Sequence, residues 1–428
     1  MALLVNRPRV SSGDSQLRCT RCDGSMKILF LNKRLLFPTD TGGQVRTLNV
    51  VRFLARWHKL TYLCNQQPGQ ECHARQMEEL GLQLETRPWQ EVSRSDWRFY
   101  RDLAKNLFSP DPFNAAKDFD PQLRARAREL LEGGQYDLVV CDFVQMARNA
   151  IGVWKGPSVL FEHNVEAEIF ERHSQSDSGW IRRRFMGYQA AKMRRFEGWA
   201  GRQFTRVIAV SDRDRKQYLQ RYGWNHVDVI DTAVDIEYYT PQEVTRDPGT
   251  VVFVGSLDWL PNVDGLTWFV AEVWPLVRQQ CPQARLRLVG RNPGAEIQGL
   301  AQQPGVELVG TVPDTRPWLS KSEVSIVPLR IGGGTRLKIF EAMAMGLPVV
   351  STTLGAEGLQ VQNGVDVVVA DESRALATAV VDLLNSPGKR AAIGGAARRL
   401  VEREFSAESV ARQFESICRR AVEEHARS

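Results

Sequence analysis

Long hydrophobic runs are missing from this sequence. Nowhere in the 428 residues do about 18 consecutive apolar residues occur, which is the length that a helix crossing a bilayer needs. The first residues, MALLVNRPRVSSGDSQLR, hold only a short apolar run with no small-residue cleavage site after it, so no secretory signal is predicted. From these two absences we expect a cytoplasmic protein.

Cysteine is also scarce. The chain has seven cysteines, an odd number scattered over its length, which argues against a framework of disulfide bonds. Cys19 and Cys22 form a CxxC pair, but no second pair or Cys/His set follows at the spacing of zinc ligands. Residues 1–25 show no periodicity, so we interpret them as a disordered leader ahead of a first strand that begins near Met26.

Charge of either sign is not in large excess. Fifty-six Lys and Arg face fifty Asp and Glu, for a net charge of +6. Arginines crowd into residues 172–215, with Lys192 among them, but no nucleic-acid-binding module accompanies them, so no nucleic-acid partner is expected. We favour a solvated basic face for this segment, with attraction to anionic phospholipid as the functional alternative.

What the chain does contain is a regular alternation of strands and helices, which is typical of parallel α/β sheets. Its length predicts two domains of about 200 residues each. The polar, proline-containing stretch at 240–250 reads as a linker. We therefore expect an N-terminal domain over 26–240, a C-terminal domain over 241–404, and a final amphipathic helix over 405–428 that is long enough to cross back to the first domain.

The most informative stretch is RIGGGTRLKIFEAMAMGLPVVST, from Arg330 to Thr352. Gly332–Gly334 follow an apolar strand, and Thr335 is suited to begin a helix that Gly346 closes. A strand, a glycine loop and a helix N-terminus in series present free backbone N–H groups to an anion. The alternative is a purely structural one, in which a turn is followed by a helix of the core.

Charged side chains on the same helix favour a nucleotide diphosphate as that anion. Arg336 and Lys338 lie in the first turn, where the helix dipole disfavours cations, so a phosphate explains them better than the helix does. Glu341 lies six residues beyond Thr335, about 9 Å along the axis, which suits a carboxylate that binds a ribose.

Two polar clusters mark the first half of the chain. Gly42 and Gly43 separate the first strand from a helix at 44–57, as either a second anion-binding turn or a plain tight turn. Glu162-His163-Asn164-Val165-Glu166 follows the strand at 158–161, where parallel sheets place their ligands. We interpret His163 as a functional side chain rather than a structural loop residue.

A third segment, residues 88–119, mixes aromatic and basic side chains without a clear period. Such a segment can line an acceptor site or rest on a membrane surface. Short helices that pack their Trp and Phe side chains into the domain are the interpretation that we favour.

From Met26 onward, the chain resembles a retaining glycosyltransferase of family 4. The resemblance implies the α/β fold called GT-B, in which two Rossmann-like domains face each other and a C-terminal helix crosses back to the first. The motifs that carry it, in chain order, are PTDTGGQVRTLN (38–49), FEHNVEAEIFERH (161–173), VIAVSDRDR (207–215), VIDTAVDIEYYTP (229–241), VVFVGSLDWLPNVDG (251–265) and the glycine stretch with its helix.

The same resemblance implies roles for single residues. His163 would hydrogen-bond the transferred sugar, Arg336 and Lys338 would neutralise the leaving diphosphate, and Glu341 would bind the ribose. No metal or other cofactor is implied, because basic side chains and helix ends stabilise the leaving group, and no Asp-x-Asp stands at a strand exit. The remaining donor-binding positions would be Gly42, Gly43, Gly255, Ser256, Arg291, Val312, Gly332, Gly333, Gly334 and Thr335.

The chain departs from the family pattern in three ways. Gly333 stands where many members carry a glutamate, and Ser256 and Asn262 stand where many carry an Arg…Lys pair. Asp231-Thr-Ala-Val-Asp235 replaces the usual Asn-Gly-Val-Asp. These departures leave the identity of the donor sugar open, but they do not change the predicted class of enzyme.

The sequence thus predicts transfer of a hexose from a UDP- or GDP-linked sugar to a hydroxyl acceptor, with retention at the anomeric carbon. The acceptor would be a glycan, a lipid-linked sugar or a small molecule, in cell-surface polysaccharide or glycoconjugate synthesis, with peripheral contact to the inner face of the plasma membrane as an option. Glu162 and Glu166 are the nearby carboxylates that could act as nucleophile or base, a role that we do not favour. The alternatives are a nucleotide-sugar epimerase of the same fold and an inactive scaffold that binds sugar nucleotides.

Overall fold

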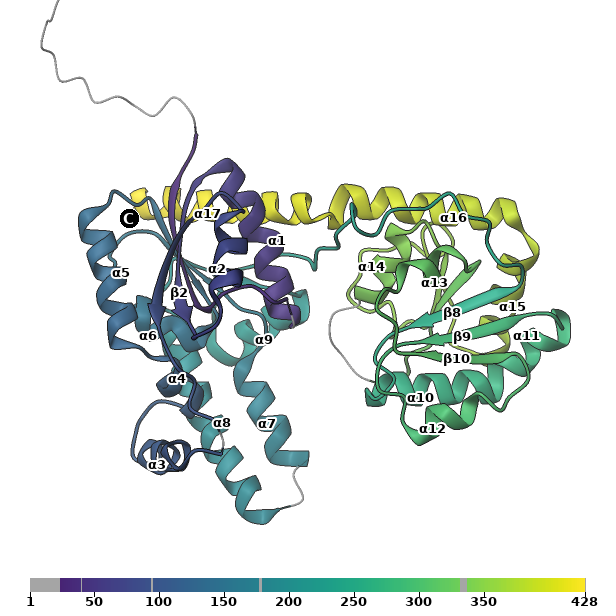
Figure 1. The fold of residues 1–428 in the computed structure, drawn as a ribbon, viewed down its shortest axis with the longest axis horizontal. Helices are drawn as coiled ribbons and strands as arrows, with labels where there is room; N and C mark the ends of the chain where they lie inside the picture. Colours follow the sequence, from purple (N-terminus) through teal and green to yellow (C-terminus); the bar gives the residue numbers. More distant parts are fainter. Residues whose placement is uncertain (1–23, 40, 94, 177–178, 332–336, 428) are drawn as a thin grey trace, which may run out of the picture.

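Two parallel β-sheets, each covered by helices, form the two domains of the protein. The computed structural model describes residues 24–427 except 40, 94, 177–178 and 332–336, and all elements below belong to those residues (Figure 1). The first sheet has the order β3-β2-β1-β4-β5-β6-β7, and every neighbouring pair is parallel. Its strands are β1 (Lys27–Arg34), β2 (Lys59–Gln66), β3 (Gln83–Pro88), β4 (Leu138–Asp142), β5 (Ser158–Phe161), β6 (Arg206–Ala209) and β7 (Val227–Val229).

Helices connect these strands and cover both faces of the sheet. Helices α7 and α8 pack against each other as a hairpin that extends away from the sheet (Figure 1). The helices are α1 (Gly42–Trp57), α2 (Glu71–Glu78), α3 (Trp97–Asn106), α4 (Phe113–Asp118), α5 (Pro121–Gly133), α6 (Ala147–Ala150), α7 (Glu166–Ser176), α8 (Trp180–Gly201) and α9 (Asp212–Tyr222), with a 3-10 turn, η1, at Val144–Met146.

The second sheet repeats the same kind of topology. Its order is β10-β9-β8-β11-β12-β13, again parallel throughout. The strands are β8 (Thr250–Val254), β9 (Arg285–Val289), β10 (Val306–Gly310), β11 (Val324–Val327), β12 (Val349–Ser351) and β13 (Val368–Val369). The helices are α10 (Leu260–Trp268), α11 (Trp274–Gln280), α12 (Ala295–Leu300), α13 (Arg316–Ser320), α14 (Leu337–Ala344), α15 (Ser373–Asn385), α16 (Pro387–Leu400) and α17 (Ala407–Arg427), with π-helical turns at Phe269–Val273 (η2) and Val401–Phe405 (η3).

The central strands of both sheets have short, continuous apolar sequences, because helices cover both faces of each sheet. Strands β4 and β8 are buried along their whole length. Alternating polar and apolar residues would have indicated a sheet with one solvated face, and neither strand shows that pattern.

Each sheet reverses its strand order at one point, and these two points place the ligand sites. In the first sheet the chain turns in opposite directions after β1 and β4, and in the second after β8 and β11. Ligands of doubly wound sheets bind beyond the carboxyl ends of the strands at such a switch point. Helix α1, which begins at Gly42, follows β1, and α14 is the next described helix after β11, so both connections leave their sheets at switch points.

The last helix, α17, belongs to the first domain although it follows the second in the chain. Its apolar residues pack into the core beneath the first sheet beside α1, and Phe414 meets Phe161 of β5 with ring centroids 5.2 Å apart. Figure 1 shows α16 and α17 running across the top of both domains. The predicted helix that crosses back to the first domain is confirmed.

The chain passes between the domains twice, and the two passages touch. Val234, after β7, pairs in a parallel bridge with Ser406, and its N–H donates to the Phe405 carbonyl at 2.9 Å. The Arg398 guanidinium donates to the carbonyls of Tyr239 and Ile236. The segment at 234–239 is therefore fastened to the second domain as well as to the first.

Several elements differ from the sequence-based expectation. The short helices expected at 88–119 are present as α3 and α4, but a helix that was not predicted, α7, begins directly at Glu166. The late strand expected at 365–369 is reduced to its last two residues, and the helix expected to run to Gln280 is interrupted by η2. The predicted linker boundary at 240–241 falls between β7 and β8.

The basic segment at 180–201 also needs a correction. Lys192 does not belong to the expected solvated face, because it is buried and its ammonium donates to the Asn106 carbonyl, whereas Arg194 and Arg195 are exposed as expected. The predicted leader, with Cys19 and Cys22, lies almost wholly outside the described residues. Among the helices that the structure does describe, none is both long and apolar enough to cross a membrane.

Candidate active site

The first half of the site is built at the carboxyl ends of β1, β4 and β5. Thr41 caps α1 by accepting a hydrogen bond from the Gln44 N–H at 3.3 Å, which leaves Gly42 and Gly43 in the first turn. The Gln44 side chain donates to the Pro38 carbonyl at 3.0 Å and so ties the preceding loop to the helix. The helix N-terminus is thereby held at the switch point of the first sheet.

His163 is buried at this edge and is oriented by a carboxylate. Its Nε2 lies 2.7 Å from Oδ1 of Asp142, the last residue of β4. The Asp142 carboxylate also accepts hydrogen bonds from the Thr47 hydroxyl at 2.8 Å and from the Asn32 amide at 2.5 Å. Two neutral donors fix the carboxylate, and the carboxylate in turn fixes the imidazole.

This pairing determines which ring nitrogen of His163 is left for a ligand. A carboxylate only accepts, so Nε2 carries the proton that Asp142 receives. Nδ1 is buried and has no hydrogen-bond partner among the described residues. In neutral His163, Nδ1 is thus an acceptor available to a sugar hydroxyl.

Aromatic rings and a glycine enclose that nitrogen. Phe143 stacks on the imidazole with centroids 4.1 Å apart, and Phe161 lies 4.3 Å from it on another side. Phe143 has φ 67°, an unfavourable value for a bulky side chain. A Cβ on Gly43 would lie 2.8 Å from Phe143 Cζ and 3.8 Å from Nδ1 of His163. The absence of a side chain at Gly43 is therefore required for this packing.

Three buried glutamates stand beside His163. Glu197 of α8 accepts hydrogen bonds from the Glu166 N–H at 2.8 Å and from the Tyr222 hydroxyl at 2.5 Å, so it caps α7. Burial raises the pKa of Glu197 to about 7. Desolvation also raises the pKa of Glu162 and the pKa of Glu166. The charge of Glu197 raises the pKa of Glu162 further. Each of these carboxyl groups is harder to ionise than an exposed glutamate.

The second half of the site lies at the carboxyl ends of β8, β9 and β10. Gly255, Gly290 and Gly310 occupy or directly follow the ends of these strands, and a Cβ on Gly290 would come within 1.7 Å of the Gly255 carbonyl oxygen. A side chain at Gly290 would thus be excluded by the neighbouring backbone.

Lys338, near the start of α14, reaches into that edge. Its ammonium donates to the Asn262 side chain and lies 4.7 Å from the centre of the Phe253 ring. A Cβ on Gly255 would lie 3.3 Å from the Lys338 ammonium. Asn262 in turn donates to the Ser256 carbonyl at 2.7 Å. The two departures from the family pattern, Ser256 and Asn262, thus form the immediate surroundings of Lys338.

Glu341 lies one turn further along α14, on the same side as Lys338. Burial raises the pKa of its carboxyl, while the Tyr239 hydroxyl, which donates to it, and the Lys338 charge act in the opposite direction. Tyr239 belongs to the segment that connects the domains. One helix at the switch point therefore presents a cation and a carboxyl group on the same side.

The remaining predicted positions are distributed as follows. Arg291 is exposed after β9, and its Nε donates to the Ser256 hydroxyl at 3.1 Å. Val312 follows β10 and packs against the apolar core beside α14. Gly332, Gly333, Gly334, Thr335 and Arg336 lie outside the described residues. Gly346, predicted to close the helix in the left-handed conformation, has φ 63°, so that prediction is confirmed.

Four residues of the site were not predicted from the sequence. Asp142, Thr47 and Asn32 form the network that orients His163, and Tyr239 bonds Glu341. Asp142 had a detectable signal, because it directly follows the buried run LVVC at the carboxyl end of a strand. Thr47, Asn32 and Tyr239 have no comparable signal in the sequence, because their hydrogen-bond partners are distant in the sequence.

Sequence comparisons match both domains to known families. Residues 41–238 match the family described as Glycosyltransferase Family 4, and residues 248–386 match the family described as Glycosyl transferases group 1. The uncharacterized 44.6 kDa protein in the cps region of Klebsiella pneumoniae is 21% identical over 316 residues, which cover 68% of this chain and 79% of that protein. The D-inositol 3-phosphate glycosyltransferase of Rhodococcus jostii (strain RHA1) is 27% identical over 233 residues, 48% of this chain and 50% of that enzyme.

Solved structures share the fold at low sequence identity. Anabaena Alr3699/HepE in complex with UDP and glucose has a TM-score of 0.59 and 17% identity, and the match covers 91% of this chain and 98% of that chain. Two Rossmann-like domains with this topology form the GT-B fold. The chain belongs to glycosyltransferase family 4, in group 1 of the glycosyl transferases.

Proposed function

We propose that this enzyme transfers a hexose from a UDP- or GDP-linked sugar to a hydroxyl acceptor with retention of the anomeric configuration. The observation that carries the proposal is the pairing of Lys338 and Glu341 on α14 at the switch point of the second sheet. The cation meets the diphosphate and the carboxylate receives the ribose hydroxyls. A UDP donor is supported by Anabaena Alr3699/HepE, whose structure contains UDP and glucose.

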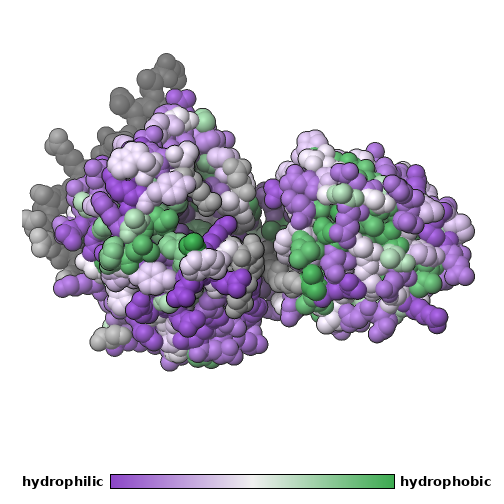
Figure 2. Space-filling view, turned by 90° about the horizontal axis from the view of Figure 1, so that it is seen from below, coloured by the Kyte–Doolittle hydropathy of each residue, from purple (hydrophilic) through white to green (hydrophobic). Residues whose placement is uncertain are grey.

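In this proposal the sugar is held by the first domain. His163 offers Nδ1 to a hydroxyl of the hexose, and Asp142 keeps the imidazole in the required tautomer. Phe143 stacks on the face of the imidazole and leaves the edge that carries Nδ1 to the sugar. Figure 2 shows the two domains as separate lobes with a notch between them, and the donor would bridge that notch.

The reaction proceeds on one face of the sugar. The bond from the anomeric carbon to the diphosphate oxygen breaks, the acceptor oxygen bonds to the same face of the carbon, and the departing diphosphate takes the acceptor proton. A covalent route through Glu162 or Glu166 is disfavoured because burial raises the pKa of both carboxyls, and a nucleophile must be ionised. No metal takes part in this scheme; Lys338 and the helix end carry the leaving-group charge.

A role in surface polysaccharide or glycoconjugate synthesis, with the protein peripheral to the cytoplasmic membrane face, completes the proposal. The Klebsiella relative, placed by its name in a cps region, supports that setting. The acceptor is then a growing glycan, a lipid-linked sugar or a small molecule that carries a free hydroxyl.

The test begins with nucleotide binding measured by calorimetry. UDP, GDP, ADP and TDP are titrated into the wild-type enzyme and into Glu341→Ala. One diphosphate should bind selectively, and the variant should bind it at least tenfold more weakly. Binding of none of the four would exclude a donor site and favour the inactive scaffold.

Transfer to water then tests the chemistry without an acceptor. The enzyme is incubated with the sugar conjugate of the selected diphosphate, and the released hexose is followed by proton NMR before mutarotation. Retention predicts the donor's own anomer, and Glu166→Gln should keep this activity. Release of the opposite anomer would contradict retention, and conversion of the donor to an isomeric nucleotide sugar would identify an epimerase.

A further inference from the structure

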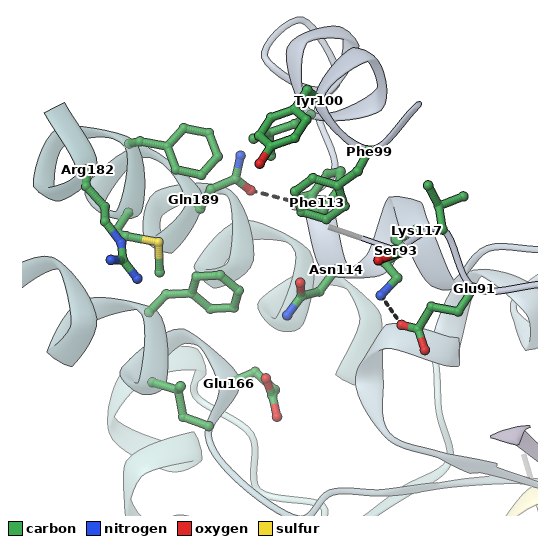
Figure 3. Close-up of a pocket in the computed structure, with 16 residues that line it drawn as sticks. Glu91, Ser93, Phe99, Tyr100, Phe113, Asn114, Lys117, Glu166, Arg182 and Gln189 are labelled. Carbon is green, nitrogen blue, oxygen red and sulfur yellow. Dashed lines mark hydrogen bonds and ion pairs between the residues drawn. The ribbon is translucent and has the colours of Figure 1, made fainter. Parts of the chain in front are cut away.

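A large pocket lies at the end of the first domain that is furthest from its sheet. Its volume is about 1120 Å³, and it opens between α3, α4, α7 and α8 (Figure 3). This is at the upper end of the range for ligand pockets. Most of its lining is apolar, and includes Phe99, Leu103, Phe113, Phe170, Phe185 and Met186.

The pocket extends from the surface toward the reaction centre. Figure 3 shows Tyr100 at one end and Glu166 at the opposite end. Tyr100 is exposed, whereas Glu166 is buried and lies three residues from His163. A molecule that enters past Tyr100 and fills the pocket would therefore end beside the segment that carries His163.

Large aromatic side chains stand exposed on α3 and α8, two of the helices that line the pocket, or directly after α3. Phe108 is 92% exposed, Trp180 70% and Trp97 67%. The expectation that the aromatic residues of 88–119 pack into the domain is thus wrong for Trp97 and Phe108. Isolated exposed hydrophobics are ordinary, but several large ones at one end of a domain mark an interaction surface.

These side chains belong to one continuous surface. The Tyr188 hydroxyl of α8 donates to the Leu107 carbonyl at 2.6 Å, which fixes the end of α3 against α8. Lys192 also joins the two segments, with its ammonium 4.6 Å from the centre of the Tyr188 ring and bonded to Asn106. We call residues 96–108 and 180–184 together the distal surface. Figure 2, which views the molecule from this side, shows hydrophobic surface in the first domain within a hydrophilic surround.

The charge of the distal surface is strongly positive. It contains six cations, Arg98, Arg101, Lys105, Arg182, Arg183 and Arg184, against two acids, Asp96 and Asp102. The acids pair with Arg98 and Arg101 at the exposed surface, where such pairs are weak. A surface that combines exposed Trp and Phe with excess arginine is complementary to an anionic lipid interface.

We propose that the distal surface docks on an anionic bilayer, and that the pocket receives the apolar chain of a lipid-linked acceptor. This inference rests on the proposed glycosyl transfer for the identity of the acceptor, but not for the docking. The lipid chain lies between α3 and α8, and its polar head lies at the Glu166 end beside His163. A water-soluble acceptor would need neither the apolar chamber nor the aromatic rim.

Docking is tested by flotation with vesicles. Wild-type enzyme is mixed with phosphatidylcholine vesicles that contain or lack about a third of phosphatidylglycerol. We expect binding to the anionic vesicles only, weakened by salt. The triple variant Trp97→Ser/Phe108→Ser/Trp180→Ser and the double variant Arg183→Glu/Arg184→Glu should each bind at least tenfold more weakly. Leu219→Ser, at an apolar residue of α9 that is 50% exposed and lies outside the distal surface, is the control and should bind like the wild type.

Three results would overturn the docking. They are equal binding to neutral and anionic vesicles, no vesicle binding at all, and a wild-type dimer that the triple variant converts to monomer, which would make a second copy the occupant. Affinity for the nucleoside diphosphate is measured on every variant. If it is intact while vesicle binding is lost, the docking surface is separate from the donor site, and a failure of docking leaves the proposed transfer untouched.

The pocket is tested with a defined amphiphile. Dodecyl phosphate, below its micelle concentration, should bind at one saturable site by calorimetry, and butyl phosphate should not bind, because it carries the same head without the chain. Met186→Arg places a charge in the pocket and should weaken dodecyl phosphate at least tenfold without changing nucleotide affinity. Equal binding of the two phosphates, or an unaffected Met186→Arg, would show that the pocket does not hold the chain.

Discussion

The Tyr239 hydroxyl donates a hydrogen bond to the Glu341 carboxyl and so joins the interdomain segment to the nucleotide half of the site. The Arg398 guanidinium holds the backbone of Tyr239 from the other side, at its carbonyl oxygen. Arg52 of α1, ten residues after Gly42, is ion-paired with Asp235 of the same segment at 3.1 Å. A single hydrogen bond thus connects Glu341 to the segment that links the two domains.

Nucleotide affinity should depend on the ionisation of Glu341. Burial raises the pKa of this carboxyl, and the Tyr239 hydrogen bond lowers it again by favouring the ionised form. The carboxylate is the form that accepts ribose hydroxyls, so affinity should fall as the pH drops through the raised pKa. Tyr239→Phe removes the hydrogen bond, raises the pKa further, and should move this loss of affinity to higher pH in calorimetric titrations from pH 8 to pH 5.

Glu341→Gln is the control for that experiment. It cannot ionise, so its titration curve reports the nucleotide's own phosphate, which has a pKa of about 6. If Tyr239→Phe and the wild type lose affinity at the same pH after this correction, the hydrogen bond does not govern the carboxyl.

The glycine pair before α1 provides a matched comparison. Gly43→Ala should lower the transfer rate by at least tenfold, because its Cβ would lie 2.8 Å from Phe143 Cζ and press that ring onto His163. Gly42→Ala should be nearly neutral, since nothing lies within 4 Å of the Cβ that it would add. Thermal unfolding of both variants checks that the fold is intact. Equal rates for the two variants would argue against a packing requirement at Gly43.

His163 should act in transfer and not in nucleotide binding. His163→Ala removes the hydrogen bond to the sugar and should reduce the rate of transfer to water by about 10²-fold or more, with UDP or GDP affinity within twofold of the wild type. Asp142→Asn should have a smaller effect, because the amide still accepts from Nε2 but no longer favours one tautomer so strongly. A variant at His163 that lost only nucleotide affinity would place this residue in the donor half instead.

Lys338 should matter for the diphosphate and little for the nucleoside. Lys338→Met keeps the aliphatic stem beside the Phe253 ring but removes the charge, and should weaken the diphosphate about 10- to 100-fold, in line with ~1.5–3 kcal/mol for a hydrogen bond to a charged group. Affinity for the free nucleoside should be nearly unchanged. Lys389→Met, at an exposed ion pair with Asp382, is the surface control.

Chelation of divalent metals should leave the transfer rate unchanged. Lys338 and the N-terminal end of α14 would neutralise the charge of the leaving diphosphate, so no step of the reaction needs a divalent metal ion. The rate is measured with EDTA and again with added Mg²⁺ or Mn²⁺. A rate that fell with EDTA and recovered with one of the ions would contradict this scheme.

The sequence was sufficient for the framework of the fold. Parallel strands that are buried on both faces are continuous apolar runs, and runs such as LVVC and VVFV are recognisable without any structure. Amphipathic periodicity likewise identified α17 and α1. The short helices favoured at 88–119 are present as α3 and α4, whereas α7 was not predicted, because the polar run at 162–166 before it has no helical period.

The site was predictable where a motif stands on consecutive residues. Lys338 and Glu341 lie on one helix, and His163 lies in a run of polar residues after a strand, so each could be placed from the sequence. The contact of Asp142 with His163 joins β4 and β5, and the contact of Tyr239 with Glu341 joins two residues about a hundred positions apart. Such contacts depend on strand order and on the path between the domains, neither of which a local pattern contains.

The position of α17 determines when the first domain can finish folding during synthesis. Domains generally fold as units in the order in which they leave the ribosome. Here the apolar side chains that complete the first core, from Ala407 to Ala421, are translated only after the whole second domain. Residues of α1 and α2 can cover part of that face early, but the core that α17 completes stays open until the last helix has been made.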